Sequence, residues 1–183
     1  MAIIQNKSDL KRFLKADFRR YGNTKIPLIV RWIIKDEMTK SMHYLWVLRH
    51  TEYAVNTKSP FRLLWILWYK RLSNLYRIYI NLNCCDEGLR LVHLGGGIYL
   101  NANKIGKSFT ATSGVVIGKK GDNQNRPIIG DNVSFGIGSI AYGRIEIEDG
   151  AIITPNSVVI KNVPKYSIMS GVPAQLINSK RNL

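Results

Sequence analysis

The sequence predicts a mainly β protein in which a β-solenoid follows an N-terminal helical domain. The main observation is a period of six residues, because small or apolar residues recur at every sixth position between residues 105 and 159. This period is neither that of a helix, about 3.6 residues, nor the alternation of an ordinary strand. A fixed repeat is typical of solenoids, in which coils stack on one another. This first row consists of Ile105, Ala111, Ile117, Ile129, Phe135, Ala141, Ile147, Ile153 and Val159.

A second row supports the same architecture. Its members lie four positions after those of the first row: Phe109, Val115, Val133, Ser139, Ile145, Ala151 and Ser157. Three hexads, about 18 residues, close one triangular coil, so residues 89–165 supply about four coils. A β-sandwich would instead show alternation, with a turn about every 8–12 residues. Extended backwards, the six-residue phase places Tyr99 and His93 in the first row.

The repeat has two further features, glycines that follow first-row residues and one position where the six-residue phase is broken. Glycine directly follows the first-row residue at Gly106, Gly118, Gly130 and Gly136. We expect these glycines to permit tight corners with positive φ. The phase is broken at Asn123, within a polar segment, 118–127, that holds two glycines and a proline. This segment is predicted to be a loop that interrupts the coils.

Residues 1–82 are predicted to form the helical domain, and residues 83–183 the solenoid with its C-terminal tail. Helices are expected from Ser8, as the capping residue, to Gly22, and over 28–34, 39–49 and 61–79, because apolar residues there follow helical spacing. From Gly88 onward, Gly, Asn, Ile and Val dominate. The open ends of a solenoid need caps, which the helices and the tail would provide.

The most apolar segment, 61–79, allows two interpretations. Arg62, Lys70, Arg71 and Arg77 interrupt it, so it does not offer the roughly 20 apolar residues that a membrane span needs. The favoured interpretation is a buried helix that packs on the solenoid or on another subunit. The alternative is an interfacial helix, with tryptophan and basic residues at a membrane surface.

Charge and cysteine content limit the function and the compartment. The formal net charge is +15, which predicts attraction to anions such as phosphorylated cofactors, acidic glycans or membrane surfaces. Cys84 and Cys85 are adjacent, a spacing that disfavours a mutual disulfide and gives no metal motif. Reduced thiols and an N-terminus without a signal-peptide pattern predict a cytoplasmic protein, with the inner face of the membrane as a peripheral location.

Several segments resemble the hexapeptide-repeat acyltransferases, whose fold is a left-handed parallel β-helix. They are the hexads themselves, the segments 128–133 and 150–160, and the ending Gly171-Val172-Pro173-Ala174. The segment 88–96 resembles the catalytic-histidine segment of the serine-acetyltransferase-like branch. The segment 48–53 resembles the helical domain of a subgroup common in capsule and exopolysaccharide gene clusters. The resemblance covers residues 8–178.

The resemblance implies an acetyl-CoA-dependent O-acetyltransferase that acts as a homotrimer, transfers acetyl directly and needs no metal. It implies His93 as the catalytic base. A hydroxyl has a pKa far above 7, so its attack on a thioester needs a base, and histidine, with an ordinary pKa of about 6.5, suits this role. His43 and His50 lie in predicted helices, where packing explains them. His50 is the better outside candidate, at the acceptor end of the site.

This chain departs from the serine enzymes at three places. Those enzymes orient the histidine with an upstream acid, but 78–80 holds no carboxylate. Val92 stands where they carry an aspartate that contacts serine, and Ser113 where they tend to have His or Gln. Asp86 or Glu87 is one candidate to orient His93, and a backbone carbonyl is the favoured one. Val92, Gly95 and Gly96 would shape the acceptor cleft.

Acetyl-CoA would need backbone donors for its carbonyl and cations for its phosphates. The resemblance places Gly118, Ile137 and Gly138 along the thioester groove. The cations that flank the far part of the groove are Lys119, Lys120, Arg126, Lys161 and Lys165. Gly95-Gly96-Gly97 lacks the G-x-G-x-x-G spacing of a dinucleotide site.

Three functions follow, in order of preference. The first is O-acetylation of a sugar hydroxyl on a surface polysaccharide or its precursor, and the second is O-acetylation of serine for cysteine synthesis. The third is a non-catalytic basic trimeric scaffold. Nucleic-acid binding would favour basic and aromatic residues interleaved on one face. The segment 61–79 offers little of this, so no nucleic-acid partner is expected.

Overall fold

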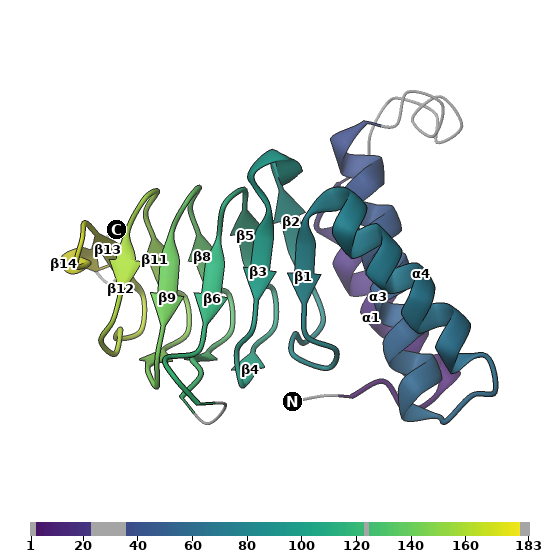
Figure 1. Ribbon diagram of the computed structural model, residues 1–183. Coiled ribbons are helices and arrows are strands. Elements are labelled where there is room, and N and C mark those ends of the chain that lie inside the picture. Colours follow the sequence, from purple (N-terminus) through teal and green to yellow (C-terminus); the bar gives the residue numbers. More distant parts are fainter. Residues whose placement is uncertain (1–2, 23–35, 123–124, 180–183) are drawn as a thin grey trace.

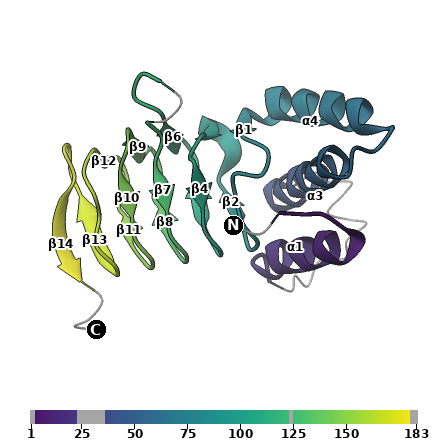
Figure 2. The same cartoon turned by 90° about the horizontal axis from the view of Figure 1, so that it is seen from below.

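The computed structural model describes residues 3–22, 36–122 and 125–179, with helices at one end of a column of stacked coils (Figure 1). The described helices are α1 (Lys7–Arg19), α3 (Glu37–Asn56) and α4 (Arg62–Tyr76). In Figure 2, α3 lies between the other two. The helix predicted over 28–34 lies outside the described residues.

The column has three sides, each a sheet with strands from successive coils. Side A contains β1 (Ile78–Ile80), β3 (Ile98–Leu100), β6 (Val116–Gly118), β9 (Ile140–Tyr142) and β12 (Val158–Val159). Side B contains β4 (Lys104–Ile105), β7 (Ile128–Ile129) and β10 (Glu146–Ile147). Side C contains β2 (Arg90–Val92), β5 (Thr110–Thr112), β8 (Ser134–Phe135), β11 (Ile152–Ile153), β13 (Ser167–Ser170) and β14 (Gln175–Ser179). All pairs are parallel except β13 with β14, so the predicted parallel β-helix is confirmed.

Both predicted rows form the core of the column. Every residue of the first and second rows is buried. Ile140 pairs with Val158, so the chain between them forms one regular coil of three hexads. Val116 pairs with Ile140, a separation of four hexads, because the loop after β6 adds one hexad to that coil. Asn123, where the phase breaks, lies outside the described residues.

The backward extension of the phase is wrong. Ile98 and Leu100 point inward, whereas Tyr99 is 45% exposed and stacks on Tyr79 with ring centroids 4.9 Å apart. The pairing of Ile78 with Ile98 shows that the first coil is longer than three hexads. A short 3₁₀ turn, η1 (Leu94–Gly96), lies in this coil. The phase itself shifts after Tyr99, because the inward residues Leu100 and Ile105 are five positions apart instead of six.

Three of the four repeat glycines, Gly106, Gly130 and Gly136, serve a different purpose from the predicted one, and Gly118 has open space where a Cβ would lie. The corner residues with positive φ lie three positions after the first row, as at Gly114 (75°), Asn132 (57°) and Gly138 (67°). Gly106 and Gly136 directly follow the first row, where coils approach closely. A Cβ at Gly106 would lie 2.6 Å from the carbonyl of Gly130, in the next coil. These glycines are therefore required by stacking rather than by a left-handed backbone.

Tyrosines of the helical region cap the open edge of the first coil. On side A, the Tyr44 hydroxyl donates to the carbonyl of Ile78 at 2.9 Å, and Tyr69 bonds the backbone of Ile80. On side C, Tyr21 receives the N–H of Leu91 at 2.9 Å. Unpaired strand edges invite pairing with other chains, so these hydroxyls close the column. The predicted capping role of the helices is confirmed.

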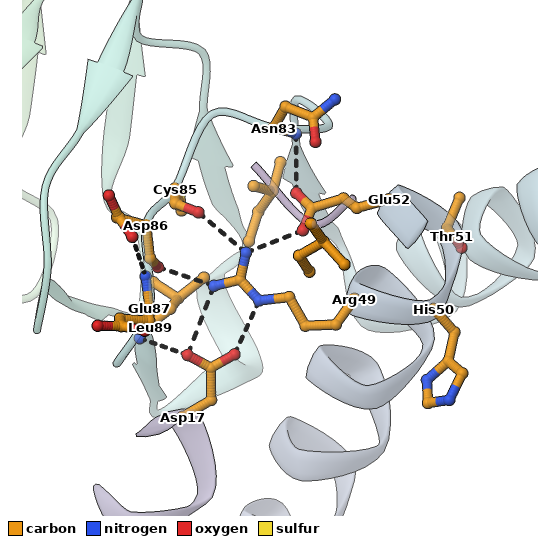
Figure 3. A network of polar contacts seen from close by, with 12 residues as sticks. Asp17, Arg49, His50, Thr51, Glu52, Asn83, Cys85, Asp86, Glu87 and Leu89 are labelled. Carbon is orange, nitrogen blue, oxygen red and sulfur yellow. Dashed lines mark hydrogen bonds and ion pairs between the residues drawn. The ribbon is translucent and has the colours of Figure 1, made fainter. Parts of the chain in front are cut away.

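Side B is capped by a buried ionic network around Arg49 (Figure 3). Arg49 is fully buried and uses all five of its N–H donors. They reach Asp17 (2.8 and 3.4 Å), Glu52 (2.9 Å), and the carbonyls of Cys85 (2.9 Å) and Asp86 (2.8 Å). Burial alone lowers the pKa of Arg49, but Asp17 and Glu52 raise it above its ordinary value.

The carboxylates of this network also bind backbone N–H groups of the first coil. Asp17 accepts from Gly88 at 2.7 Å and from Leu89 at 2.8 Å. Glu52 accepts from Asn83 at 2.8 Å. The network thus fixes α1 and α3 to the chain that leads into β2. Since α3 also carries Glu37 at its start, the network determines where Glu37 lies.

Helix ends differ from the predicted ones in detail. The side chain of Asn6, not Ser8, caps α1 by accepting from Asp9 at 2.9 Å. Helix α3 begins after Asp36 and continues to Asn56, well beyond the predicted end at Arg49. The predicted domain boundary at residue 82 falls inside the first coil, because β1 already belongs to side A. At the other end of the column, β14 covers β13.

Candidate functional site

His93 lies at the corner between sides C and A, directly after β2. Its backbone is left-handed (φ 58°) and its side chain is 64% exposed. The backbone N–H of His93 donates to a carboxylate oxygen of Glu37, the first residue of α3. The other oxygen of Glu37 lies 3.7 Å from Nδ1 of His93. The helical region therefore places a carboxylate beside His93, whereas the segment 78–80 has none.

The two carboxylates predicted to orient His93 lie elsewhere. Asp86 is buried, and its Oδ1 accepts from the N–H of Glu87 at 2.8 Å. Glu87 faces Lys107 at 3.0 Å and Arg12 at 3.5 Å. The prediction that either residue orients His93 is wrong, because the Arg49 network draws this part of the chain toward side B.

Successive coils align several predicted site residues with His93. We call His93, Gly96, Ser113, Ile137 and Gly138 the His93 edge, because all lie at the corner between sides C and A. Gly96 donates to Ser113 Oγ at 2.6 Å, and Gly138 donates to the carbonyl of Ser113 at 2.9 Å. Gly95 lies beside Gly96 with open space around it.

This geometry changes the expected role of one backbone donor. Gly138 is predicted to line the thioester groove, but its N–H bonds the carbonyl of Ser113 in the neighbouring coil and is not available to a ligand. The side chain of Ile137 is 48% exposed at the same corner. Gly118 is at the end of β6, on the opposite edge of side A. The residues expected to hold the thioester are thus divided between two edges.

The second edge, between sides A and B, is basic. We call Lys119, Lys120, Arg126, Arg144 and Lys161 the cationic edge, because all lie between a side A strand and the side B position that follows it. Arg126 and Arg144 line a depression of about 420 Å³ together with Asn103, Ile128, Ile145, Glu146 and Asn162. Lys119 and Lys120 are exposed at the start of the loop that leaves β6. This edge can bind a phosphate group.

Arg144 was missed by sequence reasoning, although a signal existed. Ile128 pairs with Glu146 of the next coil, so Arg126 and Arg144, each two positions earlier, are equivalent positions of neighbouring coils. Lys165, in contrast, lies at the third corner, between sides B and C. It is ion-paired with Asp149 at 3.6 Å, away from both edges of side A. Its predicted role in phosphate binding is not supported by this placement.

His50 is not near His93. It lies 13 positions after Glu37 on α3, or about 20 Å along the helix axis. Its ring stacks on Trp65 with centroids 5.0 Å apart, and its Nδ1 bonds the carbonyl of Trp46 at 2.8 Å. Burial lowers the pKa of His50, as it does for His43, whose ring meets the edge of Trp68. Both histidines pack between α3 and α4, as predicted for His43.

No family model matches the chain. The chain is 30% identical over 155 residues to the serine acetyltransferase of Buchnera aphidicola subsp. Schizaphis graminum, a match that covers 80% of this chain and 55% of that protein. It is 37% identical over 78 residues to the serine acetyltransferase of Staphylococcus epidermidis. This match covers 42% of this chain and 37% of that protein. The chain thus spans about half or less of the length of these curated relatives.

Solved structures support the fold. The apoenzyme of soybean serine acetyltransferase matches with a TM-score of 0.75 at 23% identity, over 93% of this chain and 70% of that one. Serine acetyltransferase from Brucella abortus, in complex with coenzyme A, matches with a TM-score of 0.70 at 19% identity, over 94% and 69%. These matches confirm the predicted left-handed parallel β-helix with an N-terminal helical region.

Proposed function

We propose that this protein is an acetyl-CoA-dependent O-acetyltransferase in which His93 is the general base. The observation that carries the proposal is the carboxylate of Glu37 held against His93 on an exposed corner. A carboxylate that accepts from Nδ1–H leaves Nε2 as the base. Nδ1 and the nearest oxygen are 3.7 Å apart, and a small rotation of these exposed side chains would bring them into hydrogen-bond range.

The proposed reaction needs no covalent enzyme intermediate. His93 takes the proton of the acceptor hydroxyl as its oxygen attacks the thioester carbon. The tetrahedral intermediate collapses with cleavage of the C–S bond, and the coenzyme A thiolate takes the proton from His93. The cationic edge would hold the phosphates of the cofactor, since Arg126 and Arg144 line its depression.

Serine is the acceptor we favour. The relatives reported above are serine acetyltransferases, and Glu37 places a carboxylate where an ammonium group of the acceptor would need one. A surface-polysaccharide hydroxyl is the second candidate, supported by Val92, which stands where the serine enzymes carry an aspartate. The deciding experiment measures coenzyme A release from acetyl-CoA with L-serine or with capsule oligosaccharides. Release with neither acceptor would contradict the proposal.

The proposal includes a homotrimer with active sites between protomers. Outward residues of side A in successive coils are aromatic or aliphatic, as at Tyr79, Tyr99 and Tyr142. Such a surface suits packing against another copy of the chain.

Cys84 and Cys85 are buried and free, which supports a reducing, cytoplasmic compartment.

Glu37→Gln is expected to lower kcat about tenfold or more, because His93 loses the group that orients it. The split between kinetic constants identifies the role of Glu37. A fall in kcat at constant KM indicates orientation of His93, whereas a rise only in the KM for serine indicates contact with the acceptor. Glu87→Gln is the matched control and should leave both constants unchanged, since Glu87 faces Lys107 and Arg12. Wild-type kinetics for Glu37→Gln would exclude both roles.

Replacing Lys119 and Lys120 together by alanine is expected to raise the KM for acetyl-CoA more than the KM for acetyl-dephospho-CoA. The physical reason is that dephospho-CoA lacks one phosphate for these cations to bind. Lys11→Ala/Lys15→Ala, on the exposed face of α1, removes the same charge elsewhere. An equal rise for both cofactors, or the same rise in the control, would remove the phosphate role.

A further inference from the structure

Helix α4 presents an apolar face that no part of the described chain covers. Its inward side is buried through Tyr69, Leu72 and Ser73. On the outward side, Leu63, Leu64, Leu67 and Leu75, with Phe61 just before the helix, are 63–67% exposed. We call these five residues the α4 face. The prediction of a buried helix over 61–79 is therefore right for only one side of it.

The α4 face is placed where a flat partner can reach it. Helix α4 is the outermost helix of the layer, with α3 beneath it and α1 on the far side (Figure 2). The face runs along a helix of 15 residues, which is about 22 Å long. Within the described residues, no helix is long and apolar enough to cross a bilayer.

The charge around this face has one sign. Residues 53–85 contain no aspartate or glutamate, but they contain Lys58, Arg62, Lys70, Arg71 and Arg77. Lys70 and Arg71 are exposed on α4 between the leucines. If two copies packed through this face, their cations would repel each other, because residues 53–85 supply no acidic partner. An anionic surface would satisfy both the leucines and the cations.

We infer that the α4 face docks on the surface of a bilayer that contains anionic lipids. The leucines enter the boundary between headgroups and acyl chains, as amphipathic helices do. Lys70 and Arg71 extend their aliphatic stems along this boundary and place their charges at the lipid phosphates. Docking of this kind would hold the coils beside the membrane. The inference does not depend on which acceptor the enzyme uses.

Co-sedimentation with lipid vesicles tests the inference on the full chain. The protein is expected to bind vesicles of phosphatidylcholine that contain about 30 mol% phosphatidylglycerol, and not vesicles of phosphatidylcholine alone. Leu64→Glu/Leu67→Glu should abolish binding. Lys70→Gln/Arg71→Gln should weaken it by about 30-fold, because each cation near an anionic surface changes the affinity by about fivefold.

Matched variants distinguish binding by the α4 face from non-specific hydrophobic or electrostatic binding to vesicles. Leu176→Glu/Ile177→Glu changes two exposed apolar residues on β14, and Lys11→Gln/Lys15→Gln removes two charges on α1. Both should bind vesicles nearly as the wild type does. Failure of the wild type to bind anionic vesicles, or unchanged binding by Leu64→Glu/Leu67→Glu, would overturn the inference. Sedimentation velocity without lipid gives a further check. If Leu64→Glu/Leu67→Glu forms a smaller assembly than the wild type, the α4 face is a contact between copies and the inference is overturned.

Discussion

Replacing His93 by alanine is expected to lower kcat by about 10²–10⁴-fold, the usual contribution of a positioned acid–base group. The acceptor hydroxyl would then have no base to take its proton as it attacks the thioester. Folding should be unaffected, because the side chain is 64% exposed and its contacts are limited to Glu37 among the interactions described. The measurement is coenzyme A release with saturating acetyl-CoA and serine.

The control for this variant is His43→Gln. His43 packs against Trp68 between the helices and takes no part in the proposed chemistry. It should therefore retain the wild-type rate, once both variants are shown to unfold at similar temperatures. A His93→Ala enzyme with the wild-type rate would show that another group is the base.

Arg49→Met is expected to lower the free energy of unfolding by about 3–5 kcal/mol. The substitution leaves Asp17 and Glu52 in a buried site without their cation, and breaking a buried pair in this way is far more costly than losing a surface pair. It also leaves the carbonyls of Cys85 and Asp86 without their donor. Unfolding in urea or guanidinium chloride, followed by circular dichroism, gives the change in free energy.

Arg12→Met is the matched control for Arg49→Met. Arg12 is about half exposed and pairs with Asp9 at 3.2 Å and Glu87 at 3.5 Å. Its loss should cost no more than about 1 kcal/mol, as is usual for surface pairs. Equal costs for the two variants would contradict a central role for the Arg49 network. Replacing Asp17, Arg49 and Glu52 together by Asn, Met and Gln should recover part of the loss, because no charge is then left unpaired.

The repeat made most of the β-helix predictable. Each inward position holds a small or apolar residue because it is buried. The first row, which ends at Val159, and the second row, which ends at Ser157, could therefore be recognised one hexad at a time. The prediction failed where one coil departs from three hexads. The inward residues Leu100 and Ile105 are five positions apart rather than six, so Tyr99 faces outward although the phase places it inward. A period that begins at Ile105 carries no information about a residue missing just before it.

The site was predictable only in part. His93 could be found from the resemblance of its segment, and Arg144 could have been found from its spacing of one coil after Arg126. Glu37 could not be found in either way. It is 56 residues from His93 in the sequence, and their contact depends on how α3 docks on the first coil. That docking depends on the Arg49 network, whose partners come from three separate segments, and on the bond from Tyr44 to Ile78.

The coils, the inward rows and the segment that carries His93 could all be read from the amino-acid sequence, because each depends on residues close together in the chain. The folded arrangement was needed to learn which carboxylate contacts His93, which lysines share an edge and which side of α4 is uncovered in the described chain. These features arise where helices meet coils or where one coil lies on the next. Contacts of this kind join residues far apart in the sequence, and no local pattern records them.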